Sequence, residues 1–226
     1  MKRSFIVIAA ALLGSPVFAQ EVQQEVQTSR SYTRAANQAL EITLGAGYAQ
    51  GFGDIGAGQR SLTDETSAGG EITLGVGYRV NPNFMVGLYG SGAKYGTRAL
   101  TSGADIWTAS AGAQANYHFL PDNDWDPWVG LGSGWRGQWI SSAGTDVRHG
   151  WDVARLTAGV DYRVSPEFAV SPYVGMGVTT FLTQERAGES SFSNINSPNA
   201  NVWLFGGIQG RFDLFGSGSS PRLASN

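Results

Sequence analysis

The chain contains no cysteine, and this absence excludes disulfide cross-links and thiolate metal sites. After the N-terminal stretch it has no run approaching ~20 apolar residues, so no later segment is predicted to cross a membrane as a helix. Charge is also scarce, because charged residues make up 15% of the chain and the formal net charge is -3. A mildly acidic chain lacks the basic surface that nucleic acids require, so we expect no nucleic-acid partner.

The first nineteen residues have the three regions of a cleaved export signal. Lys2 and Arg3 form the positive region, residues 5–13 form the apolar core, and residues 17–19 fit a small-residue cleavage site. The alternative interpretation is a retained helical anchor, but the apolar core is too short to span a membrane. We therefore expect the mature chain to begin at Gln20. Removal of the two positive charges of the signal changes the formal net charge from -3 to -5.

Apolar and small or polar residues alternate along much of the chain. In the segment Leu40–Tyr48, every second side chain is apolar and shares one face, while Glu41, Thr43 and two glycines share the other. Eight such segments occur, and most reach the ~9–11 residues that a tilted membrane strand needs. We predict strands at 39–50, 70–80, 84–95, 106–120, 127–140, 149–164, 167–183 and 199–215.

The connections between these predicted strands alternate in length. Short connections lie at 81–83, 121–126 and 165–166, and longer ones lie at 51–69, 96–105, 141–148 and 184–198. Transmembrane barrels have short periplasmic turns and longer outer loops, and a closed sheet satisfies every backbone group in lipid. The predicted fold class is therefore all-β, an eight-stranded antiparallel up-and-down transmembrane β-barrel with both termini in the periplasm.

The remaining segments complete the predicted domain organisation. Residues 1–19 are the signal peptide, residues 20–38 are a polar periplasmic arm, and residues 39–215 form the barrel. Residues 216–226 are rich in glycine and serine and are expected to form a flexible tail.

Aromatic residues on the predicted apolar faces fall into two groups along the strands. Two belts of amphipathic rings are typical of a barrel whose two ends meet the membrane interfaces. The predicted aromatic girdle comprises Tyr78, Phe84, Tyr117, Phe119, Tyr162, Phe168 and Phe212 at the end with the short turns, and Tyr48, Trp107 and Trp139 at the end with the long loops.

The opposite faces of the strands are predicted to fill the lumen. An eight-stranded barrel is just wide enough for its own side chains, and many inward glycines here leave room for a few large inward residues. The inward charges are four acids and five arginines, which should pair because buried charges need partners. This predicted lumen charge network comprises Glu41, Glu71, Arg79, Arg136, Arg155, Asp161, Arg163, Arg211 and Asp213.

Two pairings are expected within this network. Closure places the first strand beside the last, so Glu41 should pair with Arg211, and a second cluster should join Glu71, Arg136 and Arg155. One hypothesis is that these pairs only hold the barrel together, and the other is that they gate slow ion leakage.

The candidates for chemistry are few. His118 is predicted to face the lumen as a hydrogen-bonded residue, and His149 is predicted to lie at the loop rim near Ser141 and Asp146. Residues 122–126 resemble the start of a calcium loop, but the glycine and glutamate that such a loop requires are missing, which indicates a solvated turn. The sequence therefore predicts no catalytic residue, no cofactor, no metal site and no enzymatic activity.

Three local features resemble a known family. They are the repeated Gly-x-Gly-Tyr strand cores, Asn-Pro-Asn-Phe at 81–84 and Ser-Pro-Glu-Phe at 165–168. The chain thus resembles the small eight-stranded outer-membrane β-barrel superfamily of Gram-negative bacteria, which includes OmpA-like transmembrane domains, opacity-type proteins and OmpW-like porin-family proteins. It departs from that pattern where it runs eleven residues past Phe215, beyond the usual terminal assembly signal.

The resemblance implies an outer-membrane location, contact with outer-membrane lipid and lipopolysaccharide, and recognition by the outer-membrane assembly machinery. It leaves three functions open. These are a structural or surface-interaction barrel that binds a ligand through its loops, a narrow channel for small or apolar solutes, and a lipid-modifying enzyme of the outer leaflet. A secreted β-sandwich is the alternative fold, and the two aromatic belts argue against it.

Overall fold

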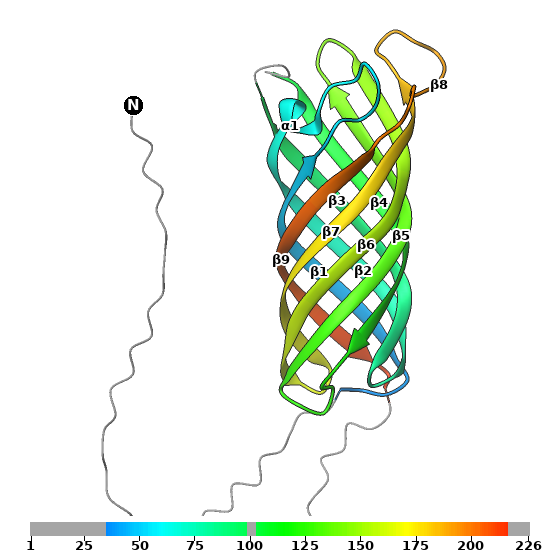
Figure 1. Ribbon diagram of the computed structural model, residues 1–226. Coiled ribbons are helices and arrows are strands. Elements are labelled where there is room, and N and C mark those ends of the chain that lie inside the picture. Colours follow the sequence, from blue (N-terminus) through cyan, green and yellow to red (C-terminus); the bar gives the residue numbers. More distant parts are fainter. Residues whose placement is uncertain (1–34, 99–102, 217–226) are drawn as a thin grey trace, which may run out of the picture. The chain divides into compact units, whose positions relative to one another are not determined.

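The computed structural model describes residues 35–98 and 103–216 (Figure 1). The predicted signal peptide, most of the predicted arm and nearly all of the predicted tail lie outside these residues. The long strands are β1 (Ala39–Phe52), β2 (Thr66–Asn81), β3 (Phe84–Thr97), β4 (Asp105–His118), β5 (Trp125–Ser141), β6 (Thr145–Ser165), β7 (Phe168–Glu185) and β9 (Ala200–Leu214). Two short elements, α1 (Leu62–Glu65) and β8 (Ser193–Asn194), lie in the connections.

The eight long strands form one closed antiparallel barrel. Each pairs with the next along the chain, and β9 pairs with both β7 and β1, so the sheet closes without an edge. The short strand β8 is an addition that pairs only with β7, opposite Thr183 and Gln184. The predicted fold class is therefore confirmed, with one extra strand. Within the described part of the chain, no helix is long and apolar enough to cross a membrane.

The two ends of the barrel differ. At one end, which we call the turn end, β1 begins, β9 ends and the connections 82–83, 119–124 and 166–167 lie (Figure 1). The other end, which we call the loop end, carries the connections 53–65, 98–104, 142–144 and 186–199. The predicted long loop at 141–148 is wrong, because β5 and β6 continue pairing up to Ser141 and Thr145 and leave only three residues between them.

Side chains alternate between a buried lumen face and an exposed outer face. The pattern is clear along β1, where Glu41, Thr43 and Gly45 are buried while Leu44 and Tyr48 are exposed. Large apolar residues on the outer faces of all eight strands are exposed, including Leu74, Leu131 and Val174. Exposed apolar surface of this extent suits the hydrocarbon core of a bilayer.

Glycines make room for large side chains inside the barrel. A Cβ atom on Gly159 would lie 2.7 Å from the indole ring of Trp128, and one on Gly175 would collide with the ring of Phe205. Small residues thus lie opposite large ones on neighbouring strands, so that the large side chains fit in the lumen. At the seam between β1 and β9, a Cβ atom on Gly47 would collide with the backbone of Gly206, so only glycine permits this close approach.

Bulges interrupt the regular register of β6. The one that matters here is at Val153, where Val153 and Ala154 together oppose Ser133 of β5, and where Val153 has no partner in the pairing with β7. A bulge inserts one extra residue and so reverses which positions face inward beyond it. Asp152 therefore points into the lumen and is fully buried, whereas strict alternation from Arg155 would place it on the lipid face.

Candidate functional site

The most unusual chemistry of this barrel lies in its lumen. All nine residues of the predicted lumen charge network are buried, with exposed fractions between 0% and 6%. The structure adds further buried charges to them and sorts the whole set into layers along the barrel axis. The layer at the turn end, which we call the turn-end network, comprises Glu41, Arg79, His118, Asp126, Asp161, Arg163, Arg211 and Asp213.

Glu41 and Arg211 are at the centre of the turn-end network. The Glu41 carboxylate accepts a 2.6 Å hydrogen bond from Nη2 of Arg79 on β2 and another from Nη1 of Arg211 on β9. The Nε atom of Arg211 also lies 2.8 Å from Oδ2 of Asp161, and its guanidinium lies 5.1 Å from the ring centre of Trp128. One arginine thus connects β9 with β1 and β6, so it braces the strand that closes the barrel.

The rest of the turn-end network continues around the lumen. Asp213 lies 3.4 Å from Nε of Arg79 and accepts a 3.0 Å hydrogen bond from Nη1 of Arg163. His118 is hydrogen-bonded through Nδ1 to Oδ2 of Asp126 at 2.8 Å, as expected of a lumen histidine. Sequence reasoning missed Asp126 because it placed this residue in a solvated turn, whereas β5 begins at Trp125 and directs Asp126 inward.

Three of these residues have the right atoms for a metal site. Ligand atoms of His118, Asp126 and Asp161 lie within 4.8 Å of one another. However, the guanidinium of Arg211 lies 2.8 Å from Asp161, and a cation at this point would be repelled by it. The arrangement fits an ion-pair network better than a metal centre.

A second layer lies nearer the loop end. Arg136 donates two hydrogen bonds to the carboxylate of Asp152, at 2.8 and 3.0 Å, and Thr179 donates a third. The Arg136 guanidinium also lies 4.7 Å from the ring centre of Trp203. A bidentate, fully buried pair of this kind holds both side chains in one geometry.

The predicted cluster of Glu71, Arg136 and Arg155 is present as three interacting buried charges, but Glu71 makes no direct ion pair within it. Among residues 35–98 and 103–216, no ion pair joins Glu71 to either arginine. Arg136 instead pairs with Asp152, which precedes the bulge at Val153, and the Arg155 guanidinium lies 3.8 Å from the ring centre of Phe205. The β-bulge in β6 is the physical reason, because it supplies an inward carboxylate that regular alternation does not provide.

Little open space remains between these two layers. A cavity of about 40 Å³ lies in the middle of the lumen and is lined by polar side chains that include Thr43, Gln114, Asn116 and Arg155. This volume holds only a few water molecules.

The loop end is closed by an apolar layer that we call the loop-end cap. It consists of Ile55 and Leu62 from the first connection, Ile195 from the last, and Phe181 and Trp203 from the barrel wall, all buried. The two connections are joined to each other, since the Ala57 amide donates to the Asn196 carbonyl at 3.1 Å and the Asn199 amide donates to the Ile55 carbonyl at 3.0 Å. The loop-end cap therefore covers the lumen at the loop end.

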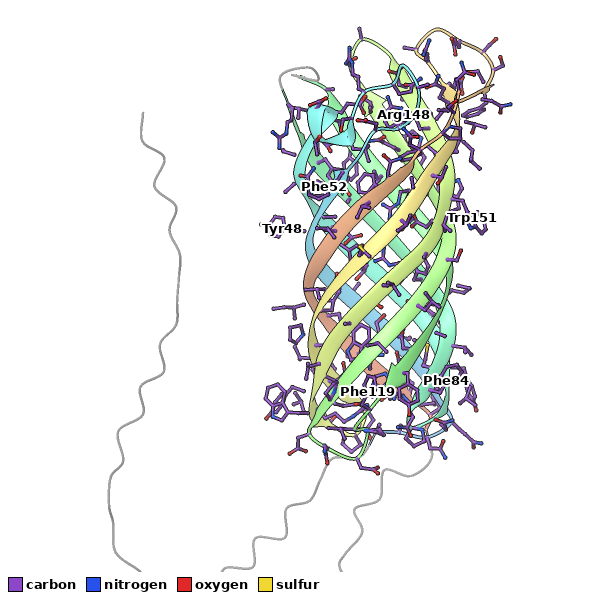
Figure 2. All side chains as sticks on the ribbon, viewed as in Figure 1. Tyr48, Phe52, Phe84, Phe119, Arg148 and Trp151 are labelled. Carbon is purple, nitrogen blue, oxygen red and sulfur yellow. The ribbon has the colours of Figure 1, made fainter. Side chains whose placement is uncertain are left out.

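An ion pair fixes this cap to the barrel wall. Arg148 on β6 donates two hydrogen bonds to Glu65 of α1, at 2.6 and 2.9 Å, and a third to Gln138 at 3.2 Å. Figure 2 shows Arg148 at the loop end, beneath the connections. Sequence reasoning missed this pair, because Glu65 lies in a predicted loop and 83 residues separate it from its partner.

His149 has other neighbours than expected. It belongs to an aromatic cluster on the outer face of the barrel, with ring centres 5.4 Å from Trp135, 6.1 Å from Trp139 and 5.0 Å from Phe192. The predicted neighbours, hydroxyl and carboxylate groups such as those of Ser141 and Asp146, are therefore wrong, although the contact with Phe192 keeps His149 close to a loop-end connection. The imidazole is surrounded by rings rather than by groups that could take part in nucleophilic catalysis.

The predicted aromatic girdle lies on the outer face. Eight of its ten residues are exposed, and the other two, Phe168 and Trp139, are partly buried because they contact Phe212 and Trp135. Figure 2 shows Tyr48 toward the loop end and Phe84 and Phe119 near the turn end, on opposite sides of the apolar band. The structure adds Phe52, Trp125 and Trp151, which are also exposed.

Residues 5–206 match the sequence family described as outer membrane protein beta-barrel domain. The chain belongs to this family. It is an outer-membrane β-barrel protein of the small-barrel group, and the resemblance stated from its sequence motifs is confirmed. No curated protein sequence matches it.

Several solved structures are similar to this chain. The Neisserial surface protein A (NspA) superposes with a TM-score of 0.52 at 15% identity, covering 77% of this chain and 97% of that one. Two Pseudomonas aeruginosa proteins are also similar. OprG has a TM-score of 0.48 at 16% identity, and the match covers 78% of this chain and 98% of OprG. The N-terminal β-barrel domain of OprF has a TM-score of 0.43 at 15% identity, and the match covers 78% of this chain and 99% of that domain. At such identities the likeness to NspA shows the fold alone.

Proposed function

We propose that this protein is a closed outer-membrane barrel with a structural and surface-interaction role, and that its functional surface is the loop end. The observation that carries the proposal is the filled lumen. The loop-end cap, the Arg136–Asp152 layer and the turn-end network follow one another along the axis, and the cavity between them is about 40 Å³. A solute would have to displace buried, paired charges to pass.

The orientation follows from the same argument. Short turns and both barrel termini lie together at the turn end, and barrels of this class keep their short turns in the periplasm. We infer that the loop end faces the cell exterior, where a surface ligand would meet the connections 53–65 and 186–199. The outer-membrane assembly machinery and membrane lipid are the remaining partners that we propose.

The channel and enzyme hypotheses have less support. A narrow channel needs a continuous path, and the apolar cap and the two charged layers stand across it. An enzyme of the outer leaflet needs reactive groups near the loop end, and His149 there contacts three aromatic rings. We therefore favour a non-enzymatic role.

The absence of native cysteine allows a direct test of surface display. Ser142→Cys places a thiol in the loop-end connection between β5 and β6, and Asn83→Cys places one in the turn-end connection between β2 and β3. On intact cells, a membrane-impermeant maleimide is expected to label Ser142→Cys and to leave Asn83→Cys unlabelled. Both variants should react after the cells are lysed, which controls for thiol reactivity. Labelling of Asn83→Cys alone on intact cells would overturn the proposed orientation.

A further inference from the structure

A row of paired outer-face residues crosses four neighbouring strands in the half of the barrel nearer the loop end. The register places Tyr48 of β1 opposite Gly70 of β2, Gly70 opposite Lys94 of β3, and Lys94 opposite Trp107 of β4. One level nearer the turn end, Gly92 of β3 lies in the same outer face. Two exposed aromatic rings therefore stand on either side of a cation and two glycines.

The two glycines leave a hollow in the outer surface. Gly70 and Gly92 are exposed, and a Cβ atom built on either one would meet nothing within 4 Å. A hollow of about 590 Å³ is lined by these glycines together with Tyr48, Lys94 and Trp107. We call these five residues the glycine notch. The backbone of Gly70 and Gly92 forms part of its floor, beside the exposed side chain of Ile72, so a flat group can approach the sheet closely over the two glycines.

The Lys94 ammonium is available to a ligand in the notch. Its Nζ atom lies 5.2 Å from the ring centre of Trp107 and 2.8 Å from Oδ1 of Asp105. Both members of this ion pair are exposed, Lys94 by 53% and Asp105 by 64% of their side chains. An exposed pair of this kind contributes little stability, so the ammonium can exchange the Asp105 carboxylate for another anion.

The depth of the notch points to a lipid headgroup as the ligand. Tyr48 and Trp107 belong to the aromatic belt at the loop end, where lipid headgroups meet the apolar band. A phosphate at this depth can accept a hydrogen bond from Lys94, and basic residues at a membrane interface bind anionic headgroups. The apolar face of a sugar ring can stack on an aromatic ring beside it.

From this geometry we infer that the glycine notch binds the phosphorylated sugar headgroup of an outer-leaflet glycolipid of the lipid A type. Lys94 contacts the phosphate, Tyr48 and Trp107 flank the sugar, and the Gly70 and Gly92 backbone forms part of the floor. A glycerophospholipid supplies the phosphate but has no flat ring to fill the space between the two aromatic side chains. This inference rests on the proposed orientation, which places the notch in the outer leaflet.

The test is native mass spectrometry of the full chain folded in neutral detergent micelles. Diphosphorylated lipid A is titrated against the protein, and phosphatidylglycerol is titrated in parallel. Folding of each sample is verified beforehand by its heat-dependent gel mobility. We expect lipid A to bind about ten-fold more tightly than phosphatidylglycerol, since only lipid A presents both the phosphate and the ring.

Two variants remove the recognition elements separately. Lys94→Gln should weaken lipid A binding about five-fold, because one cation near an anionic surface contributes on this scale. Gly70→Leu should weaken it about ten-fold, because the new side chain fills the notch without a clash inside the barrel. Asp105→Asn should strengthen binding, because it frees the Lys94 ammonium from its present partner.

Matched controls accompany these variants. Ala113→Leu adds the same bulk on the lipid face of β4 below the notch, and Arg60→Gln removes an exposed cation in the first connection, so both should bind lipid A as the wild type does. Equal affinity for the two lipids, or wild-type binding by both Lys94→Gln and Gly70→Leu, would overturn the inference. Micelles impose no orientation, so this result stands apart from thiol labelling on cells, which tests the proposed function alone.

Discussion

Arg211→Met is expected to destabilise the folded barrel by about 3–5 kcal/mol, because removing one partner of a buried pair leaves an uncompensated charge. Arg211 contacts Glu41 and Asp161, and all three side chains have no exposed surface. The turn-end network holds four acids and three arginines beside His118. The variant changes this count to four acids against two arginines. The measurement is urea-induced unfolding in lipid vesicles, followed by tryptophan fluorescence.

Two companion variants show whether the effect comes from the network. Arg186→Met removes an exposed arginine at the loop end and should change stability by no more than about 0.5 kcal/mol. Adding Asp161→Asn to Arg211→Met should recover part of the lost stability, because the first change leaves Asp161 without its arginine, whereas Glu41 keeps its hydrogen bond from Arg79. A single Arg211→Met variant as stable as the wild type would show that the turn-end network does not brace the barrel.

Leu74→Arg is expected to cost about 2–4 kcal/mol, because an arginine on the lipid face at the midplane of a barrel carries a penalty of this size. Leu74 is exposed on β2, four residues from the Tyr78 belt and four from Gly70 in the loop-end row. This equal spacing places Leu74 midway between the two belts. Its partners on the neighbouring strands are Leu44 and Gly90. The same unfolding assay in vesicles measures the loss.

Thr97→Arg is the matched control for this effect of depth. Thr97 ends β3 at the loop end and is exposed, so an arginine there lies beyond the aromatic belt and should be tolerated. Equal losses for the two variants would contradict the assignment of the apolar face to lipid, because the penalty should depend on depth.

The barrel could be predicted from the sequence because its main signal is local. Alternation with a period of two fixes which side chains share a face, and residues such as Leu40 and Tyr48 express it without reference to the rest of the chain. Closure also constrains register, so the first and last strands had to meet. The prediction that Glu41 lies beside Arg211 needed only the alternation of faces and the closure of the barrel.

The errors arise where the structure departs from regular alternation or depends on distant segments. A bulge leaves no clear signal in the sequence, and the one beside Val153 turned Asp152 inward and changed the partner of Arg136. The loop-end cap depends on contacts such as Glu65 with Arg148, across 83 residues. The position of His149 likewise depends on Phe192 of a distant connection.

A closed lumen is the central feature of this barrel, and single-channel recording in planar lipid bilayers measures closure most directly. The wild-type protein is inserted in concentrated potassium chloride, insertion is verified by recovery of heat-modifiable protein, and an open porin serves as the positive control. With the loop-end cap and both charged layers in place, we expect inserted protein to give no current steps above those of the bare bilayer. Regular conductance steps from the folded wild-type protein would contradict a filled lumen and would establish a channel instead.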